Sequence, residues 1–238
     1  MQLVILASGK GSRLKNKTKN IPKCLVKING KSIIDYNKKI FSEFKNIIIV
    51  TGYKSKLIEE KFKNKKISFI KNKNFKTTNM VYSFFCASRY ITKSVLICYA
   101  DIIFNHKILH LLKKNHTSIV VKKNWFSYWK KRMSYKDIFD DAENITIKKN
   151  YVESIGGKIN KNNIPKNQFM GIIKITLKDF KKLKKFFFKL KSYNIDFTSF
   201  LDLALKNKVI RLKAIETKLF WLEIDTIKDL KYAEKKLN

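Results

Sequence analysis

The residues best suited to chemistry lie in a loop near the start of the chain. An apolar run, Leu3 to Leu6, leads into the segment ASGKGSR at positions 7–13. Because glycine carries no Cβ, backbone N–H groups in such a loop can approach a phosphate chain closely. Arg13 and the neighbouring lysines would neutralise the phosphates. The loop therefore predicts a binding site for a nucleoside triphosphate.

Strand-like and helix-like segments alternate through the first half of the chain and determine where this loop lies. We expect strands at Gln2–Leu6, Ile47–Val50, Ile67–Ile70, Ser94–Tyr99 and Ser118–Val121, and helices at Ser32–Phe44, Ser55–Phe62, Asn79–Ile91 and His106–Lys113. This alternation predicts an α/β protein with a three-layer Rossmann-like fold, in which helices cover both faces of a mostly parallel mixed sheet. Ligands of such sheets bind beyond the carboxyl ends of the strands, where the loop and Asp101 both fall.

The region from Trp125 to about Lys166 has a different composition. It is aromatic, charged and hairpin-like, with the turn expected at Gly156-Gly157, and we interpret it as a small substrate-recognition lobe. Beyond it we expect strands at Gln168–Ile175, Val209–Ala214 and Phe220–Glu223, and helices at Asp179–Leu190, Phe197–Leu205 and Asp229–Leu237. Because no linker rich in Pro, Gly or Ser divides the chain, residues 1–238 are expected to form a single domain that carries this lobe.

The charge and hydropathy of the chain bear on its partners. A formal net charge of +35 over 238 residues would suit a nucleic acid. The lysines are scattered, however, and arginine is rare, so we expect no nucleic-acid partner. No apolar run approaches the roughly 20 residues that span a bilayer, and no charged-then-apolar leader precedes the first strand. We therefore expect no membrane partner and a cytoplasmic location.

Several short motifs resemble the signature of the nucleotidyltransferases that activate sugar phosphates and similar phosphorylated alcohols. The first part of the chain contains LASGKGSRL at 6–14, PKCL at 22–25 and GKSI at 30–33. Further segments, TNMVYS at 78–83, YADI at 99–102, QFMG at 168–171 and WLEID at 221–225, are similar to landmarks of the branch that contains the phosphocholine and 2-aminoethylphosphonate cytidylyltransferases. Ser8 departs from the alanine of many members, but both residues are small.

The resemblance implies roles at the phosphate end of the site. Arg13 would hold the β- and γ-phosphates with its fork of donors, and Lys23 would stabilise charge at the α-phosphate or the attacking phosphate. Asp101 and Asp225 would meet over one Mg²⁺, which takes oxygen ligands; each could instead cap a helix N-terminus. The nucleotide would contact Leu6, Ala7, Ser8, Gly9, Gly11, Asn79 and Ala100, although helix capping explains Asn79 equally well.

The resemblance also implies an acceptor pocket built from the lobe. The candidate residues are Trp129, Arg132, Asp141, Glu143, Lys158 and Glu223. An aromatic face attracts an ammonium group and a carboxylate balances its charge, so this set suits a cationic head group. Arg132 and Lys158 would bind the acceptor's phosphate or phosphonate. The alternatives are core packing for the aromatic residues and solvated turns for the acids.

The resemblance, together with these residues, implies a cytidylyltransferase that uses CTP and Mg²⁺. It would join CMP to phosphocholine or 2-aminoethylphosphonate and release pyrophosphate. One alternative keeps the chemistry and changes the acceptor to a sugar 1-phosphate or polyol phosphate, with another nucleoside triphosphate. A second alternative is a non-catalytic nucleotide or nucleic-acid binder, which predicts loss of Arg13 or of a metal-binding carboxylate. A homodimer through the apolar C-terminal half stays open.

Overall fold

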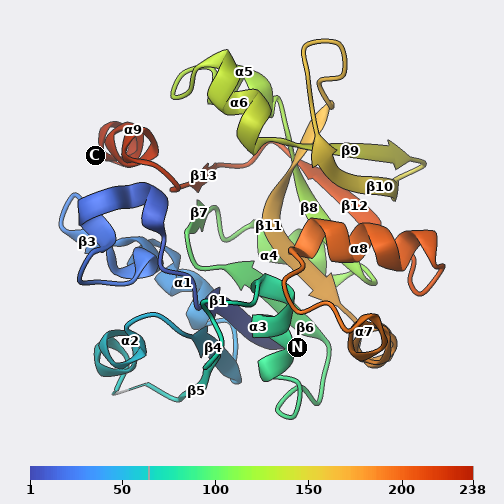
Figure 1. Ribbon diagram of the computed structural model, residues 1–238, viewed down its shortest axis with the longest axis horizontal. Coiled ribbons are helices and arrows are strands. Elements are labelled where there is room, and N and C mark those ends of the chain that lie inside the picture. Colours follow the sequence, from blue (N-terminus) through green and yellow to red (C-terminus); the bar gives the residue numbers. More distant parts are fainter. Residues whose placement is uncertain (64, 238) are drawn as a thin grey trace.

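A nine-stranded mixed sheet forms the centre of the molecule (Figure 1). The computed structural model describes residues 1–63 and 65–237. The strands, in spatial order, are β5 (Ile67–Lys71), β4 (Ile47–Thr51), β1 (Gln2–Ala7), β6 (Val95–Tyr99), β11 (Asn167–Ile175), β8 (Ser118–Lys123), β12 (Lys213–Thr217), β10 (Tyr151–Lys158) and β9 (Glu143–Lys148). Among these strands, only β11 and β10 run opposite to the others, because each pairs antiparallel with both of its neighbours. The remaining pairs are parallel, so the sheet is mostly parallel, as the sequence predicts.

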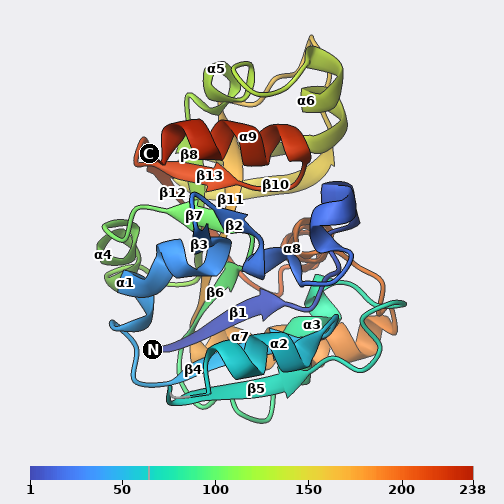
Figure 2. The same ribbon diagram turned by 90° about the vertical axis from the view of Figure 1, so that its left-hand side faces the viewer.

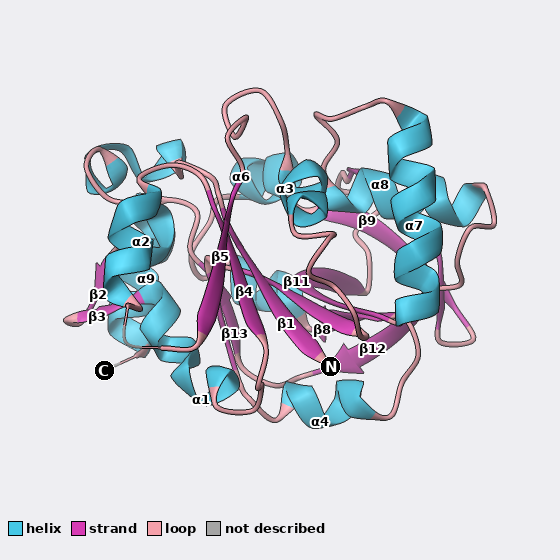
Figure 3. Ribbon diagram, turned by 90° about the horizontal axis from the view of Figure 1, so that it is seen from below, coloured by secondary structure: helices cyan, strands magenta, loops and turns pink. Residues whose placement is uncertain are grey.

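Helices cover both faces of this sheet. They are α1 (Lys38–Phe41), α2 (Ser55–Lys61), α3 (Met80–Cys86), α4 (Ile108–Lys113), α7 (Leu177–Leu190) and α8 (Phe197–Lys206). The last helix, α9 (Ile227–Lys236), packs instead against a separate apolar cluster with Leu14 and Ile28. Figure 3 shows α3 and α8 on one side of the strands and α1 and α4 on the other. Successive side chains of a strand point to opposite faces, and β1 follows this rule: Leu3 and Ile5 pack on the α1 and α4 side, whereas Val4 and Leu6 pack on the α3 side.

Two small antiparallel ribbons lie beside the large sheet. One pairs β2 (Lys27–Ile28) with β3 (Lys31–Ser32), and the other pairs β7 (Ile102–Phe104) with β13 (Trp221–Glu223). The second ribbon joins segments more than a hundred positions apart in the chain. It therefore brings the end of β6 close to the end of β13.

The segment 125–166, which the sequence analysis interprets as a recognition lobe, contains two short helices as well as a hairpin. These are α5 (Trp125–Trp129) and α6 (Tyr135–Asp141), which lie above α9 in Figure 2. The hairpin joins β9 to β10, but its turn is at Lys149-Asn150, where both residues have positive φ. Gly156 and Gly157 lie within β10, where their positive φ angles accompany a shift in pairing register. The expected Gly156-Gly157 turn is therefore wrong, because these glycines serve a β-bulge.

Two other segments differ from the sequence-based expectation. The predicted helix 32–44 is a 3-10 helix, Ile33–Asn37, followed by the four residues of α1. It is interrupted because the Asn37 amide donates to the carbonyl of Ile102 at 2.7 Å and ties this segment to β7. The predicted strand 209–214 begins only at Lys213.

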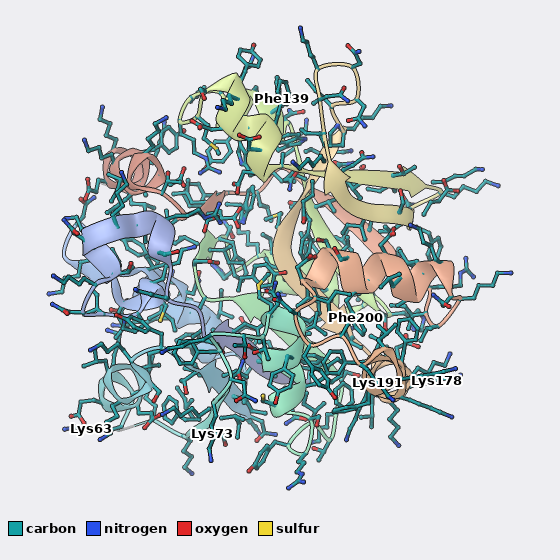
Figure 4. All side chains as sticks on the ribbon, viewed as in Figure 1. Lys63, Lys73, Phe139, Lys178, Lys191 and Phe200 are labelled. Atoms are coloured by element: carbon teal, nitrogen blue, oxygen red, sulfur yellow. The ribbon has the colours of Figure 1, made fainter. Side chains whose placement is uncertain are left out.

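Most of the cationic side chains lie around the outside of the molecule, whereas Arg132 and Lys174 are buried. Figure 4 shows long side chains projecting outward along the whole outline, among them Lys63 and Lys73. Within residues 1–63 and 65–237, no helix is long and apolar enough to cross a bilayer.

Candidate active site

The β7–β13 ribbon brings Asp101 and Asp225 together. Asp101 lies between β6 and β7, and its carbonyl accepts a hydrogen bond from the backbone N–H of Ile224 at 3.0 Å. Asp225 is the next residue, so the two carboxylates meet at one end of the ribbon. The helix-capping alternative does not apply to either residue, because a strand follows Asp101 and Thr226 is the N-cap of α9.

Lys23 lies between these two carboxylates. It begins a 3-10 turn, Lys23–Leu25, directly after Pro22. Its ammonium donates to Asp101 Oδ2 at 2.7 Å and also to Asp225 Oδ1. Burial acts to lower the pKa of Lys23, but Asp101 and Asp225 outweigh it and hold this pKa above its ordinary value. The ammonium therefore stays protonated across the physiological range.

Arg13 contacts the same cluster from the loop after β1. Its Nη2 is 2.9 Å from Asp225 Oδ1, and its Nη1 is 2.6 Å from Asp141 Oδ1. Burial acts to raise the pKa of Asp225, but Lys23 and Arg13 lower it below its ordinary value. Asp225 is thus an ionised carboxylate shared by two cations.

Two glycines, Gly11 in the loop and Gly52 after β4, allow close packing around the loop. Gly11 has a φ of 72°, and a Cβ built there would lie 2.7 Å from Lys23 Cβ. A Cβ on Gly52 would lie 2.6 Å from the carbonyl oxygen of Ser8. Side chains at either position would displace the loop or Lys23.

These side chains surround a cavity of about 290 Å³ at the carboxyl ends of β1 and β6. Ten of the predicted site residues line it: Leu6, Ala7, Gly9, Gly11, Arg13, Lys23, Ala100, Asp101, Glu223 and Asp225. Met80 and Tyr99 line it too, although sequence reasoning passed over their side chains. Met80 lies in the motif at 78–83 and Tyr99 in the motif at 99–102. These motifs were the sequence signal that could have identified the two residues.

Two predicted nucleotide contacts lie outside this lining. Ser8 is buried, and its hydroxyl is 3.3 Å from the carbonyl oxygens of Val50 and Thr51. Asn79 caps α3, because its side-chain oxygen accepts from the N–H of Met80 at 2.8 Å. The Asn79 side chain thus makes the helix cap that the sequence offers as its alternative role. Contact of Ser8 with the nucleotide through its backbone stays a prediction.

Carboxylates extend from this cavity toward the lobe. Burial first, and then the charges of Asp225, Asp141 and Asp101, raise the pKa of Glu223 well above its ordinary value. Asp141 lines a second cavity of about 570 Å³ that shares Arg13 with the first. Two cationic and four acidic side chains thus lie together in a protein with a formal net charge of +35. They are Arg13, Lys23, Asp101, Asp141, Glu223 and Asp225.

Glu143 lies against α8. The hydroxyl of Thr198 is 2.6 Å from Glu143 Oε1 and 2.8 Å from Asp196 Oδ1. Burial, and secondarily the charges of Asp196 and Asp141, raise the pKa of Glu143 to about 7. Thr198 and Asp196 were not among the predicted residues. The sequence held no signal for this contact, because both lie at the start of α8 and Thr198 is 55 positions from Glu143.

The other lobe candidates do not face either cavity. Trp129 is 1% exposed and stacks on Trp221 with ring centroids 6.2 Å apart. The guanidinium of Arg132 is buried in an ion pair with Asp229. Lys158 is exposed at the end of β10. Core packing, the alternative given for the aromatic residues, describes the surroundings of Trp129, and an ion pair describes those of Arg132. Contact of Lys158 with the acceptor stays a prediction.

The donor set at Asp101 and Asp225 fits a magnesium ion. No cluster of three or more metal-ligating side chains occurs among the described residues. Magnesium, however, commonly takes one or two carboxylates and completes its shell with phosphates and water. Both carboxylates already converge on one cationic group, and Asp101 Oδ1 is a buried oxygen without a hydrogen-bond partner. These two residues would hold the ion.

The chain belongs to the MobA-like NTP transferase family. The family model matches residues 3–141, which include the glycine loop, Lys23 and Asp101. This result confirms the resemblance to nucleotidyltransferases.

Individual relatives extend the similarity over the whole chain. The CTP:phosphoglutamine cytidylyltransferase of Campylobacter jejuni is 32% identical over 97% of this chain and 98% of its own length. The structure of the inositol-1-phosphate CTP transferase from T. maritima superposes with a TM-score of 0.80 at 19% identity, covering 99% of this chain and 95% of the other. The CTP:phosphocholine cytidylyltransferase from Streptococcus pneumoniae gives a TM-score of 0.76 at 17% identity over 100% and 99% of the two chains. The two structural neighbours confirm the nucleotidyltransferase fold.

Proposed function

We propose that this protein transfers CMP from CTP to a small phosphorylated acceptor that carries an amine, and releases pyrophosphate. The observation that carries this proposal is the convergence of Arg13, Lys23, Asp101 and Asp225 on one cavity under the glycine loop. Similarity over nearly the full length to a CTP-using enzyme supports the choice of nucleotide. Phosphoglutamine, phosphocholine and 2-aminoethylphosphonate are the acceptors that we would test first.

The cations of the site suit a triphosphate. Arg13 presents a planar fork of donors, whereas Lys23 is a compact point charge. The backbone N–H groups of Gly9 and Gly11 add dipoles without side chains to block the approach. Nucleotidyl transfer depends mainly on alignment and on compensation of developing negative charge. Arg13 and Lys23 would supply that compensation from positions that the surrounding ion pairs already fix.

Magnesium bound at Asp101 and Asp225 would neutralise charge on the α-phosphate. The chain itself needs no nucleophilic side chain, because the acceptor brings an ionised phosphate oxygen for attack on the α-phosphorus. The task left to the protein is to hold the two anions in line. Lys23 lies at the junction of the two carboxylates and is suited to contact both anions.

The acidic residues favour an acceptor with a positive group. Glu223 faces the first cavity, and Asp141 lies at the boundary of the second. An ammonium group would stabilise the ionised form of Glu223, which burial and the neighbouring carboxylates disfavour. A neutral sugar offers no such charge, so we rank sugar phosphates below amine-bearing acceptors.

A pyrophosphate-release assay tests the proposal. CTP, UTP, GTP and ATP would each be combined with phosphoglutamine, phosphocholine, 2-aminoethylphosphonate, inositol 1-phosphate and glucose 1-phosphate. We expect turnover with CTP and an amine-bearing acceptor. Turnover with glucose 1-phosphate alone would overturn the acceptor class. Binding of CTP without pyrophosphate release for any acceptor would favour a non-catalytic nucleotide binder.

A further inference from the structure

A buried ion pair links the recognition lobe to the backbone that carries the catalytic carboxylates. Arg132 follows α5 in the lobe, and Asp229 lies in the first turn of α9, 97 positions later. Each side chain is only 1% exposed, which makes this the most completely buried ion pair among the described residues. Removing two charges from water is costly, and apolar residues of similar size often serve stability equally well. The pair therefore calls for an explanation beyond stability.

Asp229 fixes the backbone at Asp225. Its Oδ2 accepts hydrogen bonds from the N–H of Asp225 at 3.1 Å and the N–H of Thr226 at 2.8 Å. It also accepts from the hydroxyl of Thr226 at 2.9 Å. The same carboxylate thus uses one oxygen to order the turn after β13 and the other to bind Arg132.

Arg132 holds the turn from its other side. Its Nη1 donates to Asp229 Oδ1 and lies 3.4 Å from the carbonyl oxygen of Glu223. Arg132 consequently contacts groups on both sides of Asp225 in the chain. Both contacts come from Nη1, which carries two N–H groups, whereas Nε and Nη2 are buried without a hydrogen-bond partner.

Aromatic rings of the lobe fix the plane of the Arg132 guanidinium. The Arg132 guanidinium lies over the ring of Trp129, 4.7 Å from its centroid, and 5.8 Å from that of Tyr128. Trp129 in turn stacks on Trp221, which belongs to β13 together with Glu223. The lobe therefore contacts β13 through the stacked rings of Trp129 and Trp221, and contacts the first turn of α9 through the Arg132–Asp229 ion pair.

We propose that Arg132 is a positioning residue, which couples the recognition lobe to the orientation of Asp225 through the Arg132–Asp229 pair. This inference rests on the proposed function for its kinetic consequences, but not for its structural ones. Misplacement of a catalytic group by about 1 Å can cost about 10²-fold in rate. Loss of the pair should therefore lower kcat. The KM for the acceptor should stay close to the wild-type value, because Arg132 lines neither cavity.

The test uses the full chain and compares four variants. Arg132→Met leaves Asp229 as an unpaired buried charge, so the double variant Arg132→Met/Asp229→Asn removes both charges and protects the fold. Arg132→Lys keeps the charge without the fork. Arg211→Met is the matched control, because Arg211 also packs on an aromatic ring, that of Tyr151 at 4.3 Å, but on the far hairpin.

The expected kinetic result is a split between kcat and KM. For the double variant, kcat should fall about 10- to 100-fold, with KM for the acceptor within about threefold of wild type and a higher half-saturating Mg²⁺ concentration. Arg132→Lys should recover part of kcat, and Arg211→Met should match wild type. A folded double variant with kcat within twofold of wild type would overturn the proposal.

Hydrogen exchange provides a readout that does not depend on the reaction. Amides of residues 225 and 226 should exchange faster in the double variant than in wild type, with unchanged protection in β1 and β6. Unchanged protection at 225 and 226 would contradict the inference even if activity fell. If wild type itself turns over no substrate, the proposed function fails, whereas the exchange result still decides the positioning role.

Discussion

At the phosphate end of the site, charged side chains face the cavity, whereas in the recognition lobe the corresponding residues face the core. Arg13, Lys23 and Asp225 form a contiguous ionic cluster around open space. Trp129 and Arg132, from the lobe, are each almost fully buried. The type of a side chain therefore indicates a role at the site only where the backbone directs that side chain into the cavity. A side chain of the same type that the backbone directs into the core serves packing or ion pairing.

The two regions differ in how their backbone is supported. Asp101 and the glycine loop follow parallel strands at the centre of the sheet, which fix their positions to the core. The lobe lies at the edge of the sheet, and its aromatic side chains attach it to the core. Trp125 and Trp129, with ring centroids 5.1 Å apart, belong to the same buried cluster as Ile5 and Trp221.

The largest expected effect is at the phosphate end. Asp225→Asn should lower kcat/KM on the order of 10²- to 10³-fold, because it removes the charge that Lys23 and Arg13 share. Steady-state kinetics at saturating Mg²⁺ measures this. Glu60→Gln, an exposed carboxylate paired with Lys63 on the surface, is the control and should leave kcat/KM unchanged. Near-normal turnover of Asp225→Asn would refute the assignment.

The matching substitution in the lobe should act on stability. Trp129→Ala should reduce the free energy of unfolding by about 3–5 kcal/mol, the cost of deleting a large buried aromatic side chain. Urea denaturation followed by circular dichroism measures it, with Trp129→Phe as the milder comparison. If Trp129→Ala kept wild-type stability and instead raised KM for the acceptor, Trp129 would belong to the acceptor site after all.

Glu143 gives a smaller effect that depends on pH. Its pKa in the folded protein is about 7 against an ordinary value of 4.5, so the folded state binds the proton more tightly. Its contribution to stability is therefore full below pH 4.5 and is lost as the pH rises to about 7, a change of about 2–3 kcal/mol. Urea denaturation at pH 5 and pH 8 should show this loss in wild type. Glu143→Gln should lack it, and equal pH slopes in the two proteins would contradict the assignment.

The smallest effect is expected at Lys158. This residue is exposed and lines neither cavity. Lys158→Ala should therefore leave KM for the acceptor within about twofold of wild type, in the range of ordinary surface substitutions. A tenfold increase in KM would show that the β9–β10 hairpin reaches the acceptor.

Much of the fold could be predicted from the sequence, because β1, β4 and β6 are continuous apolar runs that end in loops. The phosphate end could be predicted as well, since the motifs at 6–14 and 22–25 specify the residues that line the cavity. The segment 32–44 could not, because its helical periodicity gave no sign that Asn37 bonds to β7. Tertiary contacts of this kind override a local pattern.

The lobe shows the limit of arguing from residue types. Glycines at 156 and 157 suggested a turn, but positive φ angles serve a bulge there, and Lys149-Asn150 forms the turn. Arg132 suggested a phosphate contact, but Asp229 neutralises it. Arg132 and Asp229 are 97 positions apart, so no local sequence pattern could reveal their ion pair.

A crystal structure with Mg²⁺ and a non-hydrolysable CTP analogue tests the central claim most directly. We predict that the triphosphate lies between the glycine loop and Lys23, with the metal ion in contact with both Asp101 and Asp225. A nucleotide bound in another cavity, or a metal ion that touches neither carboxylate, would contradict this account.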